Sequence, residues 1–84
     1  MVLTEDFLKK NGFVLQFSFP EKNEYLLELP QENGDINFLW VDYYIYEDEC
    51  MVLYQNLCYS INKKVEQLQG ALRQKFNIEK NFVL

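Results

Sequence analysis

The chain has 84 residues, of which 49% are hydrophobic and 17% aromatic, and its formal net charge is −5. A chain of this length buries about 60–65% of its unfolded surface, and this apolar content supports a core without disulfides or metal. Because the sequence has no histidine and no glycine-rich loop, we expect one domain over residues 1–84 that has no cofactor and is not an enzyme.

The apolar segments of the sequence are short. Runs of aliphatic and aromatic residues such as Phe38–Val41 fall far short of the roughly 20 residues that a membrane span requires. Glu5 and Asp6 stand where a signal peptide would carry basic residues. We therefore expect a cytoplasmic protein.

The charges divide unevenly along the chain. Residues 1–60 hold three basic residues against eleven acidic ones, whereas residues 61–84 hold five against two. An acidic body repels nucleic-acid phosphates at long range and attracts basic proteins. We therefore expect a basic protein partner and no direct nucleic-acid binding. Single-stranded nucleic-acid binding, with aromatic rings stacking on bases, is a weaker alternative that would depend on the basic residues of the C-terminal region, Lys63, Lys64, Arg73 and Lys75.

The two cysteines, Cys50 and Cys58, are expected to be buried thiols that pack as small hydrophobic groups. A zinc site needs about four ligands, and without histidine only carboxylates would complete it. A disulfide between them depends on a strand register that the sequence leaves open.

The first predicted element is a short helix near the N-terminus. Thr4 is suited to cap it, because Glu5 and Asp6 then complement the helix dipole in the first turn. Asn11 and Gly12 provide the C-terminal stop. A helix of about two turns is marginal in isolation, so it must dock on the rest of the domain.

Strands are predicted next. Phe13, Leu15, Phe17 and Phe19 alternate and predict a strand with one aromatic face, which Pro20 ends. A turn at 21–23, a second strand at 25–29, an Asn-Gly loop within 30–35 and a long third strand at 36–46 follow. Alternation places Ile36, Phe38 and Trp40 on one face of the third strand and Leu39, Val41 and Tyr43 on the other. Both faces are largely apolar, so we expect this strand to be central in the sheet or covered on both sides.

The region after the third strand contains a turn at 47–49 and a fourth strand at 50–54. Two alternatives remain for residues 55–59, namely a tight turn with a fifth strand or one continuous strand with a bulge. The last predicted element is a helix, which a continuous apolar stripe indicates: Ile61, Val65, Leu68, Leu72 and Phe76. Ser60 or Asn62 is expected to cap it, and Gly70 to permit a close approach. The final residues Phe82–Leu84 read as an edge strand or a hydrophobic hook.

This order of elements predicts an α+β fold: a short N-terminal helix, an antiparallel sheet of four to five strands, and an amphipathic C-terminal helix packed on one face. If both helices cover the same face, the opposite face retains exposed apolar residues. A contiguous apolar patch of that kind usually marks an interface.

The third strand and the turn after it provide the candidate binding residues. Tyr and Trp supply rigid contact area with a polar end, and acids beside them pair with basic residues of a partner. The predicted partner-binding residues are Trp40, Asp42, Tyr43, Tyr44, Tyr46, Glu47, Asp48 and Glu49. Asp42 is the one candidate for a perturbed pKa, if it faces inward among the aromatic rings.

Two segments carry a resemblance to known sequences. The segment Leu3–Phe13 is similar to the opening Leu-Thr-Glu-Glu-Trp-Leu-Leu-Lys-Phe-Gly-Phe of a group of small proteins from Bacteroidota phages and prophages. Residues 65–72 resemble that group's Val-His-Gln-Leu-Gln-Asn-Leu-Tyr helix, although Glu66 replaces the usual His and Gly70 interrupts the motif. The match covers about a quarter of the chain and differs in the C-terminal tail. It implies a phage setting, and therefore a host-cell cytoplasm, but no catalytic residues.

These observations together predict a small acidic phage-type protein that acts by protein–protein binding. The function expected first is that of an inhibitor or adaptor, most of all inhibition of a host defence nuclease such as a CRISPR effector, either by occupying a basic groove or by blocking a moving domain. The partner would then be a nuclease or a ribonucleoprotein. The alternative is a structural or accessory phage protein that self-associates as a homodimer through the same aromatic face.

Overall fold

The computed structural model describes all 84 residues as two helices and five strands. In chain order they are α1 (Glu5–Lys10), β1 (Val14–Ser18), β2 (Lys22–Pro30), β3 (Ile36–Tyr44), β4 (Cys50–Tyr54), β5 (Leu57–Ile61) and α2 (Val65–Lys75). The strands form one antiparallel sheet in the order β1-β2-β3-β4-β5, so each strand pairs with its neighbour in the sequence. The predicted α+β fold is confirmed.

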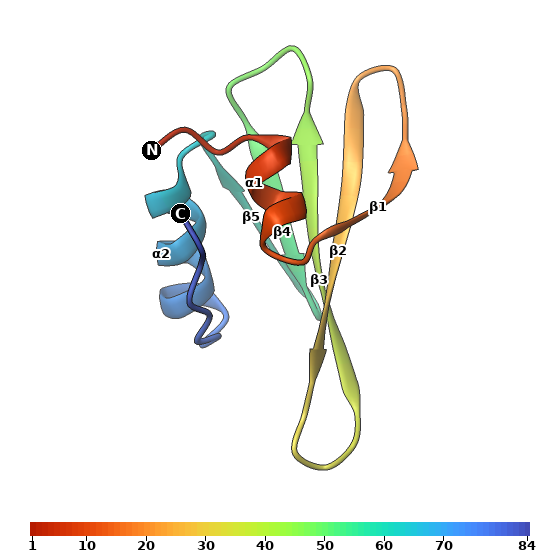
Figure 1. Cartoon of the computed structure of the whole chain (residues 1–84), viewed down its shortest axis with the longest axis vertical. Coiled ribbons are helices and arrows are strands. Elements are labelled where there is room, and N and C mark those ends of the chain that lie inside the picture. The colour runs from red at the N-terminus through yellow and green to blue at the C-terminus, as the bar shows by residue number, and fades with distance from the viewer.

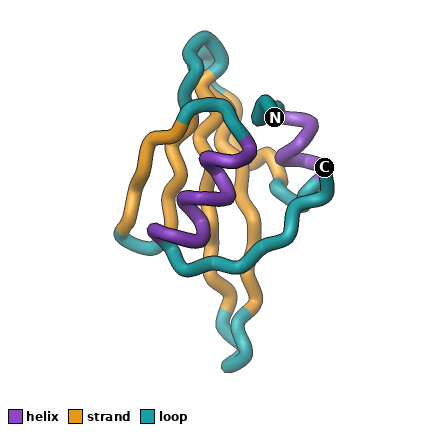
Figure 2. The backbone as a smooth tube through the Cα atoms, turned by 90° about the vertical axis from the view of Figure 1, so that its left-hand side faces the viewer, coloured by secondary structure: helices purple, strands orange, loops and turns teal.

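The molecule has two layers, because both helices and the C-terminal tail lie on the same face of the sheet (Figures 1 and 2). Successive side chains of a strand point to opposite faces. Alternate residues of the central strands therefore point to the helices and are buried: Tyr25, Leu27, Leu39, Val41, Cys50 and Val52. They form the core together with apolar residues of α1 and α2. Neither helix is long and apolar enough to cross a membrane.

Helix α1 begins and ends as its sequence predicts. The Thr4 hydroxyl accepts a hydrogen bond from the backbone N–H of Phe7 at 3.1 Å, and Gly12 adopts a positive φ of 91° just after the C-cap. One carboxylate attaches the helix to the sheet, because Oε1 of Glu5 accepts hydrogen bonds from Tyr25 at 2.6 Å and Asn23 at 2.7 Å. These contacts hold in place a helix too short to be stable alone.

The C-terminal tail does not form an edge strand, and of its three apolar residues only Phe82 packs against the core, because Val83 and Leu84 are exposed. The Phe82 ring packs edge-on against Phe7 with 5.3 Å between ring centroids. The side chain of Asn11 donates a hydrogen bond to the Val83 carbonyl at 3.1 Å and accepts one from the Val83 N–H at 2.6 Å. The tail therefore returns across the molecule to α1 and completes the cover over the core (Figure 2).

Strand β1 differs from its prediction. A register shift between Leu15 and Phe17 places Leu15 opposite Tyr25 and Phe17 opposite Glu24. Because neighbouring residues of β2 face opposite sides, Leu15 and Phe17 do so too, and the single aromatic face predicted for residues 13–19 is wrong. A bulge of this kind inserts one extra residue and resets the alternation.

The boundaries of the other strands differ from the predicted ones by a few residues. Lys22, predicted in a turn, is the first residue of β2, and β3 ends at Tyr44 rather than at residue 46. The Asn-Gly loop is confirmed, with Gly34 at a φ of 91°. Residues 55–56 form a tight turn, with Gln55 at a φ of 53°, and this decides in favour of a separate fifth strand.

Helix α2 begins later than the apolar stripe predicts. Ile61 is the last residue of β5, so the predicted caps Ser60 and Asn62 lie before the helix, and the N-cap Lys64 makes no side-chain capping bond. Gly70 does not serve a close approach, because a Cβ built on it would meet nothing within 4 Å. The helix therefore has a glycine in its interior without a steric need for one.

We expect Gly70→Ala to raise the free energy of unfolding by about 0.5–1 kcal/mol, because alanine loses less backbone entropy in a helix than glycine. The measurement is urea denaturation followed by circular dichroism. Gly34→Ala is the matched control and should lower stability by about 1 kcal/mol or more, since alanine is strained at a φ of 91°. A destabilised Gly70→Ala protein would contradict the open surroundings of Gly70.

Candidate binding face

The open face is the side of the sheet opposite the helices. Cross-strand partners point to the same side, so the strand register determines which residues meet there. One row across all five strands is apolar and consists of Val14, Leu26, Trp40, Leu53 and Cys58. The adjacent row contains two carboxylates and consists of Phe17, Glu24, Asp42, Met51 and Ser60.

Trp40 occupies the middle of the open face. Its ring stacks on that of Phe17, with 6.3 Å between centroids and 18° between planes, and Phe17 contacts Phe19 at 6.5 Å. Phe17 keeps 53% of its surface exposed and Phe38 keeps 48%. Phe19, Phe17 and Trp40 therefore form one aromatic cluster, and Phe38 lies two residues from Trp40 on the same face of β3. No other part of the chain covers this side of the sheet.

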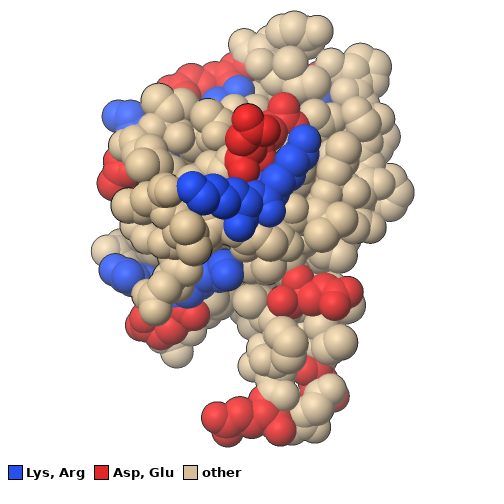
Figure 3. All heavy atoms as spheres, in the orientation of Figure 1, with Lys and Arg blue, Asp and Glu red and all other residues tan.

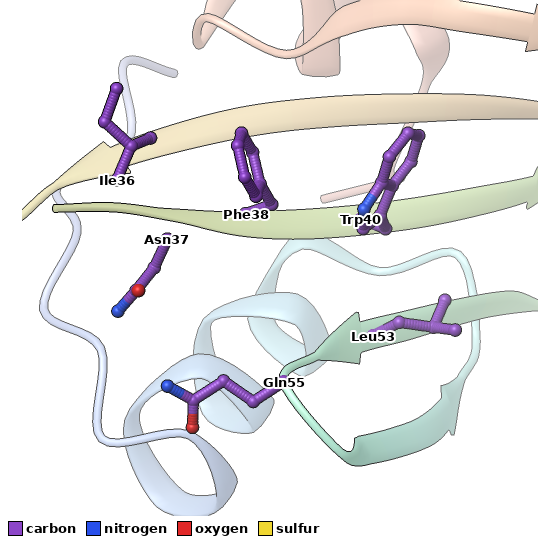
Figure 4. Close-up of a pocket in the computed structure, with 6 residues that line it drawn as sticks. All are labelled: Ile36, Asn37, Phe38, Trp40, Leu53 and Gln55. Carbon is purple, nitrogen blue, oxygen red and sulfur yellow. The ribbon is translucent and has the colours of Figure 1, made fainter.

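A shallow hollow lies along β3 beside this surface. Ile36, Phe38 and Trp40 project from the same side of β3 toward this hollow (Figure 4). Leu53 of the paired strand β4 also lines it. Asn37 and Gln55 complete its rim. A largely apolar hollow with a polar rim is suited to receive a side chain of another molecule.

An ionic cluster lies next to Trp40. The Nζ of Lys22 contacts Glu24 Oε2 at 2.9 Å and Asp42 Oδ2 at 3.0 Å. Hydrogen bonds to Glu24 and to Asp42 raise the pKa of Lys22 above its ordinary value. The same ammonium lies 5.7 Å from the ring centroid of Tyr44, within the range of a cation–π contact. The open face therefore holds a cation between carboxylates and an aromatic ring.

The structure places the predicted binding residues in three locations. Trp40, Asp42 and Tyr44 lie together on the open face of β3. Tyr43 points to the helix side, where its hydroxyl donates a hydrogen bond to the carbonyl of Leu3 at 3.1 Å and burial raises its pKa. It therefore supports the packing of the N-terminal segment and is not available on the open face.

The remaining predicted residues lie in the β3–β4 turn. Tyr46 is 84% exposed and Glu47 is exposed. Asp48 has a structural role, because its carboxylate accepts a hydrogen bond from the backbone N–H of Lys63 at 3.2 Å, and Glu49 accepts one from the Ser60 hydroxyl at 2.9 Å. Tyr46 and Glu47 are thus the two turn residues that remain free for a partner.

The β2–β3 hairpin projects beyond the rest of the sheet (Figure 1). The pairs from Glu28–Phe38 to Pro30–Ile36 lie past the last pairs that β1 and β4 make. Acidic side chains occur on this projection without basic ones (Figure 3). No lysine or arginine occurs anywhere between residues 23 and 62, a segment that carries eight acids.

Sequence reasoning found only the β3 part of the open face. Alternation along residues 36–46 placed Ile36, Phe38 and Trp40 together, but the residues that β1, β2 and β4 bring beside them depend on register. Phe17 in particular was assigned to the wrong neighbours because the β1 bulge has no clear sequence signal. Lys22 was missed because it was placed in a turn.

Comparisons with protein-family models, with curated proteins and with solved structures give no match. The function is therefore inferred from the geometry and chemistry of the open face.

The two cysteines differ in environment, which corrects the expectation that both are buried. Cys50 is fully buried on the helix side, whereas Cys58 is exposed and ends the apolar row of the open face. Burial raises the pKa of Cys50 to about 12.

We expect a thiol reagent at pH 8 to label Cys58 in the folded protein within minutes, while Cys50 reacts only on unfolding, because a buried neutral thiol is a poor nucleophile. Mass spectrometry counts the labels, and Cys58→Ser should abolish the fast reaction. Fast labelling of both thiols would contradict the burial of Cys50 in the core between the sheet and the helices.

Proposed function

We propose that the chain acts by binding a basic protein through the open face of its sheet. The observation that carries this proposal is the exposed aromatic and aliphatic surface around Trp40, which four strands build and nothing in the chain covers. A monomer rarely leaves a large contiguous apolar patch in water unless the patch has a partner. Trp is also the residue type most enriched where binding energy concentrates.

The charge distribution supports a basic partner. The only cation of the open face is Lys22, and it is shared between the two carboxylates of Glu24 and Asp42. The projecting hairpin adds Glu28, Glu32 and Asp35. A partner with lysine or arginine around an apolar contact would complement both the apolar surface and its acidic border.

The finer proposal is inhibition of a host defence nuclease, such as a CRISPR effector, by a phage-type protein. It is supported by the resemblance of the two end segments to small phage proteins and by the acidic surface. A protein of this size that enters a basic groove excludes nucleic acid from that groove. The projecting acidic hairpin has the elongated shape that such a groove admits.

Self-association is the second candidate, because the same open face would bury its apolar row against a second copy. Face-to-face packing would also bury the Glu24 and Glu28 carboxylates of both copies in one interface, and an excess of like charge in an interface is costly. Light scattering at several concentrations distinguishes the two candidates. A monomer at all concentrations supports a different partner, and a stable dimer supports self-association.

We expect Phe38→Lys to abolish capture of the partner from a Bacteroidota host lysate by the tagged protein, because it adds a cation and removes an exposed ring from the open face. Gln74→Lys on the exposed side of α2 adds the same charge far from this face and should leave capture unchanged. Equal capture by both variants would exclude the open face as the binding surface.

The turn after β3 has its own test. Capture should weaken as salt is raised, and Glu47→Lys should weaken it further, by a few-fold, because a charge at the border of an interface acts mainly on association. Glu47 is preferred over Asp48, whose reversal would also disturb the start of α2. Capture that is insensitive to both changes would remove the turn from the interface.

A further inference from the structure

We propose that a second hollow on the open face, beside Trp40, receives an arginine side chain of the partner protein. This inference rests on the proposed function and names the chemistry of its central contact. Residues of four strands line the hollow: Phe17, Glu24, Trp40, Asp42 and Leu53. It therefore combines two carboxylates with an aromatic stack and an aliphatic side chain.

The carboxylates of this hollow have unused hydrogen-bonding capacity. The shortest contacts of the Lys22 ammonium are to Glu24 Oε2 and Asp42 Oδ2. The other two oxygens, Glu24 Oε1 and Asp42 Oδ1, accept no hydrogen bond from any group of the chain. The cluster has two negative charges and one positive charge, so one negative charge remains uncompensated.

Asp42 shows most clearly that the hollow is open to a ligand. The residue is only 8% exposed, yet no buried side-chain oxygen of the protein lacks a hydrogen-bond partner. Oδ1, which has no hydrogen-bond partner, therefore keeps some exposed surface, and Asp42 is one of the residues that line the hollow. A carboxylate held in a nearly dry position with an accessible free oxygen interacts more strongly with a cation than one in water.

The aromatic wall determines which cation fits. The stacked rings of Phe17 and Trp40 place an aromatic wall next to the carboxylates. A guanidinium group is planar and weakly hydrated, stacks on aromatic faces and donates several hydrogen bonds at once. An ammonium group is compact and more strongly hydrated, so it uses such a wall less well. The hollow thus favours arginine over lysine.

Lys22 provides a precedent for this recognition within the chain. Its ammonium lies between two carboxylates and within 5.9 Å of the Phe19 ring centroid and 5.7 Å of that of Tyr44. The same combination of carboxylates and rings continues on the other side of Glu24 and Asp42, toward Trp40. There it has no cation of its own.

Trp40 reports on this hollow directly, because it is the only tryptophan of the chain. The experiment titrates the folded protein at low salt with a capped hexapeptide that carries one arginine, and follows tryptophan fluorescence. The matched probes are the same peptide with lysine and with citrulline, the uncharged isostere of arginine. We expect a saturable change with arginine, at least tenfold weaker binding of citrulline, and intermediate binding of lysine. No saturable change with arginine, or equal affinity for citrulline, would overturn the proposal.

A pair of variants separates the hollow from the general charge of the protein. Glu24→Gln should weaken the arginine peptide about tenfold, because it removes one carboxylate of the hollow and leaves the Lys22–Asp42 contact. Glu79→Gln makes the same charge change at an exposed position of the C-terminal tail, on the helix side of the sheet and outside the hollow, and it should leave affinity unchanged. Equal weakening by both variants would reduce the effect to long-range attraction and overturn the proposal.

The proposal of an arginine contact can fail while the proposal of a binding face holds, and the variants distinguish the two cases. Loss of partner capture in Phe38→Lys, together with undiminished capture in Glu24→Gln, would leave the binding face in place and reject the arginine contact. Loss of capture in both variants, with Glu79→Gln unaffected, supports the two proposals together.

Discussion

Packing of α1, α2 and the tail against a single face of the sheet is the contact on which the rest of this structure depends. Its 17 buried apolar residues form one cluster, and the sheet contributes to it only from one side. Two short helices and nine tail residues are enough to cover one face of five strands and not both. The apolar residues on the other face of β3 are consequently left in water, and the candidate binding surface is a direct result of this one-sided cover.

The tail and α1 each depend on a small number of contacts to stay packed on the sheet. Neither the helix nor the final residues have enough apolar surface to be stable alone. Each is held by a few specific contacts, Glu5 to Tyr25 on one side and Asn11 to Val83 on the other. The Phe7–Phe82 pair joins them. The open face needs no such contacts, because its strands are already fixed by their ladders and by the core beneath them.

The ionic cluster on the open face has a different character from the surface acids. Asp42 is nearly buried on the open face, where its neighbours along β3 are Trp40 and Tyr44, and removing its partner Lys22 would leave a poorly solvated carboxylate. The charges therefore fix the local arrangement of β2 and β3 as well as offering a recognition feature. Glu47 and Tyr46, by contrast, project freely from a turn and contribute little to stability.

The sequence by itself determined the α+β class, the capped first helix, the Asn-Gly hairpin and the fourth strand, because these depend on local signals: a Thr cap, a glycine at positive φ and period-two alternation. It also placed Trp40 with Phe38 and Ile36. Tertiary structure alone decided which residues surround Trp40, since the β1 bulge and the strand register bring Phe17, Glu24 and Leu53 there. It decided as well that Ile61 ends a strand, that Tyr43 faces the helices and that Lys22 joins two carboxylates. Such outcomes depend on pairing between distant segments, and no local pattern encodes them.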